Sequence, residues 1–257
     1  MKPKKSLSKC IITSAGEGSR MKRVTSVVPK GLLPLFKTEN GTKIVVPVAD
    51  LIMEAVSAAG ASDFCFVVGR HKSLLMDYLF DRGVTFVFQN KPLGFGDAVL
   101  RGADFAHDSA VIVHADDGFL TGGYVEATKL LKEKNADGVL LLRKVDNVKK
   151  RYGVAEVADR ENFMGHPAYR VIGVEEKPER PKSNLMISAA YVFSNRIFEG
   201  LRKARRESGE LELTHGIQEV INSGGNVYGL LLESEKWLNV GNTESYHRAL
   251  NYSYENL

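Results

Sequence analysis

Short apolar runs alternate with helix-like segments along the first 143 residues, and this alternation constrains the fold more than any other feature. Runs such as DFCFVVG at residues 63–69 are almost unbroken in apolar character, as in strands that are buried on both faces. Segments such as VADLIMEAVSAAG at residues 48–60 place apolar residues three and four positions apart, which predicts helices. Parallel strands need such crossover helices, so the pattern predicts an α/β fold with a mixed, mostly parallel sheet and helices on both faces.

The remaining elements follow from the same two periodicities. In the first half, strands are predicted at residues 9–13, 63–69, 84–89, 109–115 and 137–143, and helices at 48–60, 72–83, 96–107 and 122–136. After residue 143, strands are predicted at 152–158, 168–177, 185–194 and 226–234, and helices at 195–208, 212–224 and 244–256. We therefore predict a single domain over 1–257, with a first half at 8–143, a second half at 144–240 on the same sheet and a C-terminal helix at 241–257.

Composition and charge exclude several classes of protein. The net charge of +4 is too small to indicate a nucleic-acid partner, and basic residues are not interleaved with aromatic ones. No apolar run approaches the roughly 20 residues that span a membrane, and the basic N-terminus leads into too short an apolar run for a signal peptide. The only cysteines, Cys10 and Cys65, lie in apolar runs, which predicts reduced core thiols. We expect a cytoplasmic protein with no membrane or nucleic-acid partner.

A glycine-rich turn, AGEGSR at residues 15–20, follows the first predicted strand. It lacks the Gly-Lys-Ser/Thr of the Walker loop, and it lacks the third glycine of the dinucleotide-binding fingerprint. Backbone amides of such a turn can still cradle phosphates, and Arg20 and Lys30 add positive charge. Taken alone, the stretch is equally compatible with a plain turn that carries solvent-facing basic side chains.

Polar residues gather where predicted strands end. Gln89 follows the third strand, Asp116 and Asp117 follow the fourth, and Glu176 with Lys177 ends a later one. Ligands of open α/β sheets bind beyond the carboxyl ends of the strands, so these side chains are predicted to converge. His114 precedes Asp116 by two residues, but the six histidines show no metal-ligand spacing, so packing or support is expected of it.

Five motifs in order along the chain resemble those of the sugar-1-phosphate nucleotidylyltransferases, and most closely UTP–glucose-1-phosphate uridylyltransferases. The first joins an AGxGTR-type loop to a downstream Pro-Lys. A Gln with a glycine-rich helix start, an Asp at a strand end, a Glu-Lys-Pro with a later Ser-Asn, and a Trp-Leu-Asp-x-Gly-like element follow. Here they read AGEGSRMKRVTSVVPKGLLPL, QNKPLGFGDAVL, VIVHADDG, VEEKPERPKSNLMISAAYVF and WLNVGNTESY.

The resemblance implies a Rossmann-like fold whose first half binds a nucleotide and whose second half binds a sugar phosphate. It implies transfer of a nucleotidyl group from a nucleoside triphosphate, with UTP preferred, to a sugar 1-phosphate, with glucose 1-phosphate preferred, and release of pyrophosphate. The stretch LGFGDAVL favours the uridylyl over the thymidylyl form. Another nucleotidyltransferase of the same family, or a non-catalytic sugar-nucleotide-binding protein, remains an alternative. Family habit implies a homo-oligomer.

The resemblance also assigns roles to individual residues. It implies catalytic roles for Arg20, Lys30, Asp116 and Lys177; nucleotide contacts from Ala15, Gly16, Gly18, Ser19, Gln89 and Gly94; and sugar-phosphate contacts from Gly153, Glu176, Lys177 and Asn184. It implies Mg²⁺ as the cofactor, held by Asp116 and by the residue at position 239. This chain departs from the family there, because Asn239 stands where an acidic ligand is usual. An amide oxygen can coordinate Mg²⁺ but brings no charge. We expect a tolerated variant, with weaker metal binding or with Asp117 as a neighbour that compensates, and reduced or absent activity remains the alternative.

Overall fold

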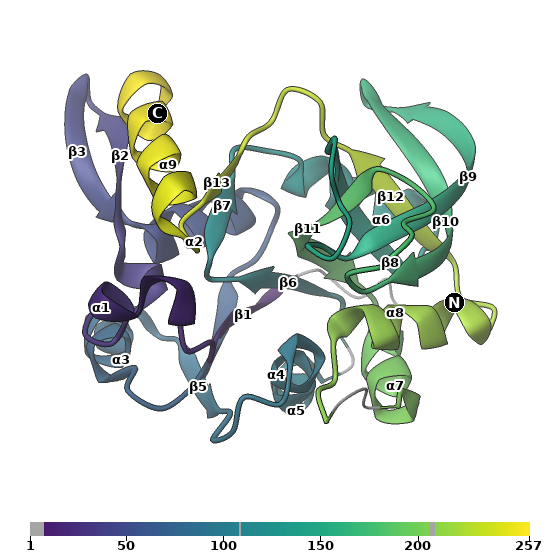
Figure 1. Cartoon of the computed structure of the whole chain (residues 1–257), viewed down its shortest axis with the longest axis horizontal. Helices are drawn as coiled ribbons and strands as arrows, with labels where there is room; N and C mark the ends of the chain where they lie inside the picture. Colours follow the sequence, from purple (N-terminus) through teal and green to yellow (C-terminus); the bar gives the residue numbers. More distant parts are fainter. Residues whose placement is uncertain (1–7, 108, 206–208) are drawn as a thin grey trace.

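A nine-stranded sheet runs through the centre of the molecule (Figure 1). The computed structural model describes residues 8–107, 109–205 and 209–257. Along the sheet the strands lie in the order β5 (Thr85–Phe88), β4 (Asp63–Val68), β1 (Lys9–Ser14), β6 (Val111–Ala115), β11 (Leu185–Phe193), β8 (Gly138–Lys144), β12 (Val227–Leu231), β10 (His166–Glu175) and β9 (Val154–Phe163).

The pairing registers confirm a mixed, mostly parallel sheet. Ile11 of β1 lies opposite Cys65 on one side and Val113 on the other, both in parallel strands. Strand β11 runs antiparallel to both β6 and β8, and β10 runs antiparallel to both β12 and β9. The other strands of this sheet therefore all point the same way, and their carboxyl ends meet along one edge.

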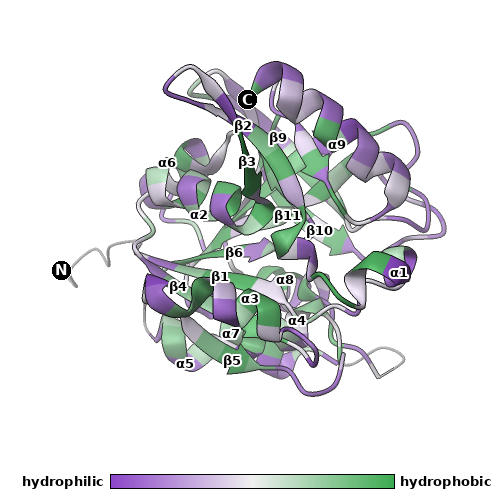
Figure 2. Ribbon diagram, turned by 90° about the vertical axis from the view of Figure 1, so that its left-hand side faces the viewer, coloured by the Kyte–Doolittle hydropathy of each residue, from purple (hydrophilic) through white to green (hydrophobic). Residues whose placement is uncertain are grey.

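Helices cover both faces of the sheet, as the alternating pattern predicts (Figure 2). Residues of β1 alternate between two cores, with Ile12 in one and Ile11 in the other. The first core is closed by α2 (Val48–Ala58), α3 (Ser73–Leu79), α6 (Tyr124–Glu133) and α9 (Thr243–Asn256). The second core is closed by α4 (Phe95–Arg101), α5 (Ala103–Ala106), α7 (Arg196–Lys203) and α8 (Leu213–Asn222). No helix in the described ranges has the length and apolar character needed to cross a bilayer.

Both cysteines lie in these cores. Cys10 and Cys65 are buried and free, which confirms the prediction of core thiols. Burial raises the pKa of the Cys65 thiol to about 12, so it stays protonated at neutral pH.

Two small sheets went unpredicted. Strands β2 (Pro34–Glu39) and β3 (Thr42–Pro47) form a hairpin, and β7 (Gly118–Leu120) pairs with β13 (Trp237–Asn239). The hairpin turn is Asn40-Gly41, both with positive φ, which is a recognisable hairpin signal. The C-terminal helix α9 packs on this hairpin, where the backbone N–H of Thr38 donates to the Leu257 carbonyl at 2.8 Å.

Several short helices complete the chain. They are η1 (Ser19–Met21), α1 (Lys22–Thr25), η2 (Lys30–Leu32) and η3 (Phe80–Arg82). The helix predicted at 195–208 ends at Lys203 as α7, and residues 206–208 of that prediction lie outside the described residues.

Candidate active site

The glycine turn after β1 is fixed by a contact that only glycine permits. Gly18 has φ 67°, and a Cβ on it would lie 2.6 Å from Oγ1 of Thr25. The Thr25 hydroxyl donates to the Gly18 carbonyl at 2.7 Å and closes the loop. No heavy atom lies within 4 Å of the place where a Cβ on Gly16 would be, so the backbone there is open to a ligand.

Arg20 and Lys30 follow this turn and line two adjoining cavities. Arg20 lies in η1, with Nη2 3.0 Å from the place where a Cβ on Gly241 would be. Lys30 begins η2 and lines the same cavity as Gly16 and Asp116. Neither basic side chain makes a hydrogen bond or an ion pair with any residue in the described part of the chain, so both charges are available to a ligand.

Asp116 and Asp117 follow β6 at the carboxyl edge of the sheet, but their surroundings differ. Asp116 is buried and accepts a hydrogen bond from the Ser14 hydroxyl. Asp117 has a buried Oδ1 that receives no hydrogen bond. Burial raises the pKa of Asp117, and the positive charges of Lys30 and Arg20 offset this only in part. Among the described residues, Oδ1 of Asp117 is thus a carboxylate oxygen without a hydrogen-bond donor.

Lys72 joins this group, and the sequence analysis did not single it out. It caps the start of α3 just after β4, and only 6% of its surface is exposed. Burial lowers the pKa of Lys72, against the favourable charge of Asp116. Its position just beyond the end of a parallel strand was the available signal, because Arg70, His71 and Lys72 follow β4 as Asp116 follows β6.

Gln89 is held rigidly at the end of β5. It is 5% exposed, and its Nε2 donates to the Gly94 carbonyl at 3.1 Å and to Oδ2 of Asp97 at 2.9 Å. Gly94 has φ 100°, and a Cβ there would lie 2.4 Å from the Leu211 carbonyl oxygen. The close approach of this loop to Leu211 therefore requires glycine and fixes the wall on which Gln89 lies.

Glu176 and Lys177 follow directly after β10 and interact with each other. Oε2 of Glu176 accepts from the Thr214 hydroxyl at 3.1 Å, and Oε1 lies 3.1 Å from Nζ of Lys177. Oε1 of Glu212 lies 3.8 Å from the same ammonium. Burial lowers the pKa of Lys177, but the two glutamates outweigh it and the net shift is upward. Lys177 also has φ 42°, a backbone conformation that is costly for a residue with a side chain.

One cavity of about 420 Å³ is lined by both Gln89 and Glu176. The structure brings together in its lining these predicted residues: Ala15, Gly16, Lys30, Gln89, Gly94, Asp116, Gly153 and Glu176. Arg20 and Asn239 line the adjoining cavity, which shares Asp117 with the first. Gly18, Ser19, Lys177 and Asn184 are not part of either lining. The Asn184 side chain is exposed, and its carbonyl accepts from the Val145 backbone N–H at 3.0 Å.

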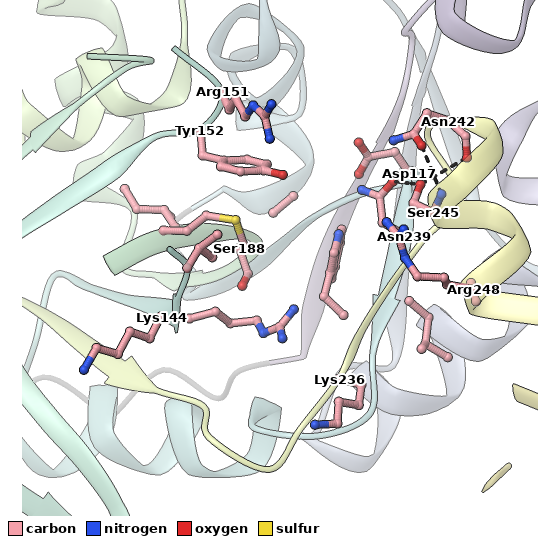
Figure 3. A pocket seen from close by; sticks show the side chains of 18 of the residues that line it. Asp117, Lys144, Arg151, Tyr152, Ser188, Lys236, Asn239, Asn242, Ser245 and Arg248 are labelled. Carbon is pink, nitrogen blue, oxygen red and sulfur yellow. Dashed lines mark hydrogen bonds between the residues drawn. The ribbon is translucent and has the colours of Figure 1, made fainter. Parts of the chain in front are cut away.

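Asn239 reaches the site through the pairing of β13 with β7, which places it opposite Gly118. Its Oδ1 accepts from the Gly241 backbone N–H and from the Ser245 hydroxyl, each at 2.9 Å (Figure 3). Ser245 belongs to the first turn of α9. The amide oxygen thus already has two donors and holds the start of α9 in place.

His114 lies behind the aspartates as a buried, neutral ring. Its Nδ1 lies 2.6 Å from the Ala115 carbonyl, which can only accept, so Nδ1 carries the proton. The other nitrogen, Nε2, then accepts from the Tyr124 hydroxyl at 2.8 Å. Burial lowers the pKa of His114 from its usual value of 6.5 to about 4.

This lowered pKa predicts a loss of stability in acid. The unfolded chain takes up the His114 proton below pH 6.5, whereas the folded chain resists until about pH 4. Stability is therefore full above pH 6.5 and falls by about 3 kcal/mol as the pH drops to 4. The measurement is urea unfolding of wild type and His114→Gln between pH 4 and 7.5. Equal pH slopes in the two proteins would show that His114 does not carry this effect.

The fold is a mixed α/β sheet with two adjoining cavities that cationic and carboxylate side chains line. Residues 9–256 match the profile of the nucleotidyl transferase family, and the chain belongs to that family. The family predicted from the sequence motifs is thereby confirmed.

Two relatives are named as enzymes that act on glucose 1-phosphate. The chain is 30% identical over 240 residues to a glucose-1-phosphate thymidylyltransferase from Streptomyces griseus, covering 91% of this chain and 62% of that protein. It is 27% identical to the UTP–glucose-1-phosphate uridylyltransferase AglF of Haloferax volcanii, covering 91% of each. Thus this chain spans less than two thirds of the length of the Streptomyces enzyme.

A solved structure shares the fold over the whole chain. The structure of UDP-glucose pyrophosphorylase complexed with UDP-glucose superposes with a TM-score of 0.85 at 22% identity, covering 98% of this chain and all of that one. This similarity confirms the predicted Rossmann-like α/β architecture.

Proposed function

We propose that this chain transfers a nucleotidyl group from a nucleoside triphosphate to a sugar 1-phosphate and releases pyrophosphate. UTP and glucose 1-phosphate are the first choice of substrates, and a thymidylyl or other base is the alternative. One observation carries the proposal: Lys30 and Glu176 line one cavity, Arg20 lines the adjoining one, and neither cation has an ion-pair or hydrogen-bond partner among the described residues. That arrangement suits two ligands, a triphosphate and a hydroxyl-rich sugar.

The chemistry joins two anions and needs no nucleophile from the protein. A phosphate oxygen of the sugar 1-phosphate attacks the α-phosphorus, a new P–O bond forms, and the bond to the β-phosphate oxygen breaks as pyrophosphate leaves. Such transfers depend on positioning and on neutralising charge. In our proposal Arg20 and Lys30 stabilise the charge on the phosphates, Gly16 admits the triphosphate to the backbone, and Lys177 holds the sugar phosphate.

A divalent cation fits the carboxylates of this site. Mg²⁺ prefers oxygen ligands and is held in proteins by one or two carboxylates together with substrate phosphates. Asp117 Oδ1, buried without a partner, is an oxygen that a cation would satisfy. Within the described ranges no group of three or more His, Cys, Asp or Glu side chains could hold a metal, so substrate oxygens would complete the shell.

We propose that Asp116 and Asp117 hold this cation. Asn239 is the second ligand that the family resemblance implied, but its Oδ1 already accepts two hydrogen bonds. Its amide therefore supports the loop at Gly241, and Asp117 supplies the charge that Asn239 lacks. When bound, the cation would neutralise the triphosphate and polarise its phosphorus.

The test is a matrix of four nucleoside triphosphates against several sugar 1-phosphates, with pyrophosphate release as the readout. We expect turnover with UTP or dTTP and a hexose 1-phosphate in the presence of Mg²⁺. Omitting either substrate serves as the control. A matrix without activity, in both Mg²⁺ and Mn²⁺, would contradict the proposal and favour a non-catalytic sugar-nucleotide-binding protein.

A further inference from the structure

A second cavity of about 740 Å³ adjoins the active-site cavity between the two halves of the molecule (Figure 3). Arg151, Tyr152 and Ser188 line one side of it, and Asn239 and Arg248 approach from the side of α9. We call it the basic cavity, because its lining holds Arg20, Arg143, Lys144, Arg151, Lys236 and Arg248 against only Asp117 and Asp146.

These basic side chains lack ion-pair and hydrogen-bond partners among the described residues. None of the six forms an ion pair or a side-chain hydrogen bond within the part of the chain that the structure describes. Elsewhere on the molecule, basic side chains do pair: Lys182 with Glu156 at 2.7 Å, and Arg196 with Asp137 at 2.8 Å. Unpaired positive side chains around one cavity repel one another, and together they attract an anion.

Arg143 is the most constrained of the six. It lies near the end of β8, opposite Met186 of β11, and is half-buried. Burial lowers the pKa of Arg143, and the nearby Tyr152 offsets this only in part. Ser188, also in the lining, has a buried hydroxyl with no hydrogen-bond partner. A guanidinium and a hydroxyl that lose water without gaining a partner destabilise the ligand-free protein, and an anion would satisfy the guanidinium.

The basic cavity adjoins the active-site cavity. The two share Asp117, Arg151, Tyr152, Ile187 and Ala189 in their linings, so a ligand that lies along these residues can contact both. Hydroxyls of a neutral hexose are met by groups such as Glu176 and do not need additional cations. The positive charge of the basic cavity therefore suits a sugar 1-phosphate that carries a further negative charge away from its 1-phosphate.

We propose that the sugar 1-phosphate used by this protein carries a second anionic group, a carboxylate or a phosphate, which binds in the basic cavity with Arg143 as its main contact. This inference rests on the proposed function and names its substrate class. A guanidinium forks onto two oxygens of either group, so both sources share the same recognition chemistry.

The experiment compares three acceptors with the full-length protein: glucose 1-phosphate, glucuronic acid 1-phosphate and glucose 1,6-bisphosphate. We expect kcat/KM to be at least about tenfold higher for one of the two anionic sugars, as one charge-assisted contact provides. The two arms separate a carboxylate from a phosphate. Arg143→Met should reduce that preference about tenfold, mainly through KM, and Arg143→Lys should restore part of it.

Arg160→Met is the matched control, because Arg160 is exposed on β9 and lines neither cavity. It should leave the preference unchanged. Turnover of glucose 1-phosphate with no preference for either anionic sugar would overturn the inference and leave the proposed function intact. An Arg143→Met variant that raises KM only for the triphosphate would also overturn it, since the cavity would then serve that substrate.

If no acceptor is turned over, equilibrium binding tests whether the basic cavity binds a second anionic group. Calorimetry with glucose 1-phosphate and glucose 1,6-bisphosphate needs no reaction. Tighter binding of the bisphosphate that is lost in Arg143→Met would support the charged-ligand site even though the proposed activity had failed. Equal affinities for the two sugars, or a difference that Arg143→Met leaves intact, would overturn it.

Discussion

Arg20→Gln is expected to lower kcat for pyrophosphate release by on the order of 10²–10³, the effect of losing one preorganised charge-stabilising group. The guanidinium lies beside Gly241 together with Asp117, and it has no partner within the described residues. Its charge therefore holds no ion pair or hydrogen bond of the fold together, although it offsets part of the cost of burying Asp117. The measurement is steady-state pyrophosphate release, with KM for the triphosphate determined in the same series.

Arg23→Gln is the matched control for this prediction. Arg23 lies three residues further along, in α1, is exposed and lines none of the cavities. It should keep wild-type kcat, and both variants should unfold at the wild-type temperature. Equal losses in Arg20→Gln and Arg23→Gln would mean that the loop acts only through its total charge.

The main sheet could be predicted from the sequence because its strands are long, apolar and separated by recognisable helices. Strand β1 and helix α2 lie within a few residues of their predicted ranges. The β7–β13 pair could not, because three-residue strands show no periodicity and their partners are more than 100 residues apart. Yet this pairing is what brings Asn239 to the aspartates.

The charged groups of the site were predictable in type but not in environment. Asp116 and Asp117 are neighbours in the sequence and both carry carboxylates, yet only Asp116 receives a hydrogen bond from Ser14. Lys72 was missed because a lysine after a strand usually points into solvent, whereas here it is buried close to the charges of Asp116 and Lys30. Such differences depend on tertiary contacts, which local patterns do not encode.

The different surroundings of Asp116 and Asp117 predict a second large effect, on the Mg²⁺ requirement and on stability. Asp116→Asn and Asp117→Asn should both impair turnover, with Asp117→Asn raising the Mg²⁺ concentration for half-maximal activity roughly 10–100-fold. Their effects on the metal-free fold should be opposite. Asp117→Asn removes a charge whose buried Oδ1 has no hydrogen-bond donor among the described residues, and it should stabilise the protein by about 1 kcal/mol. Asp116→Asn removes the charge that faces Lys72 and should destabilise the protein by a similar amount.

The pH dependence of this stabilisation follows from the raised pKa of Asp117. An ionised carboxylate whose folded pKa lies above its unfolded value weakens the fold at every pH above that raised pKa. The cost disappears as the pH falls below the unfolded value, so Asp117→Asn should be more stable than wild type at pH 7 but not at pH 3. Urea unfolding in a chelator at both pH values measures this.

Asn239→Asp tests whether Asp117 or the residue at position 239 is the second carboxylate that the metal site needs. The new carboxylate can still accept the hydrogen bonds from the Gly241 N–H and the Ser245 hydroxyl. It adds a negative charge beside Gly241, where Oδ1 of residue 239 lies 3.2 Å from the place that a Cβ would take. If Asp116 and Asp117 hold the cation, wild type turns over at saturating Mg²⁺ and Asn239→Asp only lowers the concentration required. A wild-type protein that stays inactive at saturating metal, while Asn239→Asp turns over, would show that position 239 is the missing ligand, because Asp117 then fails to supply the charge that the triphosphate requires.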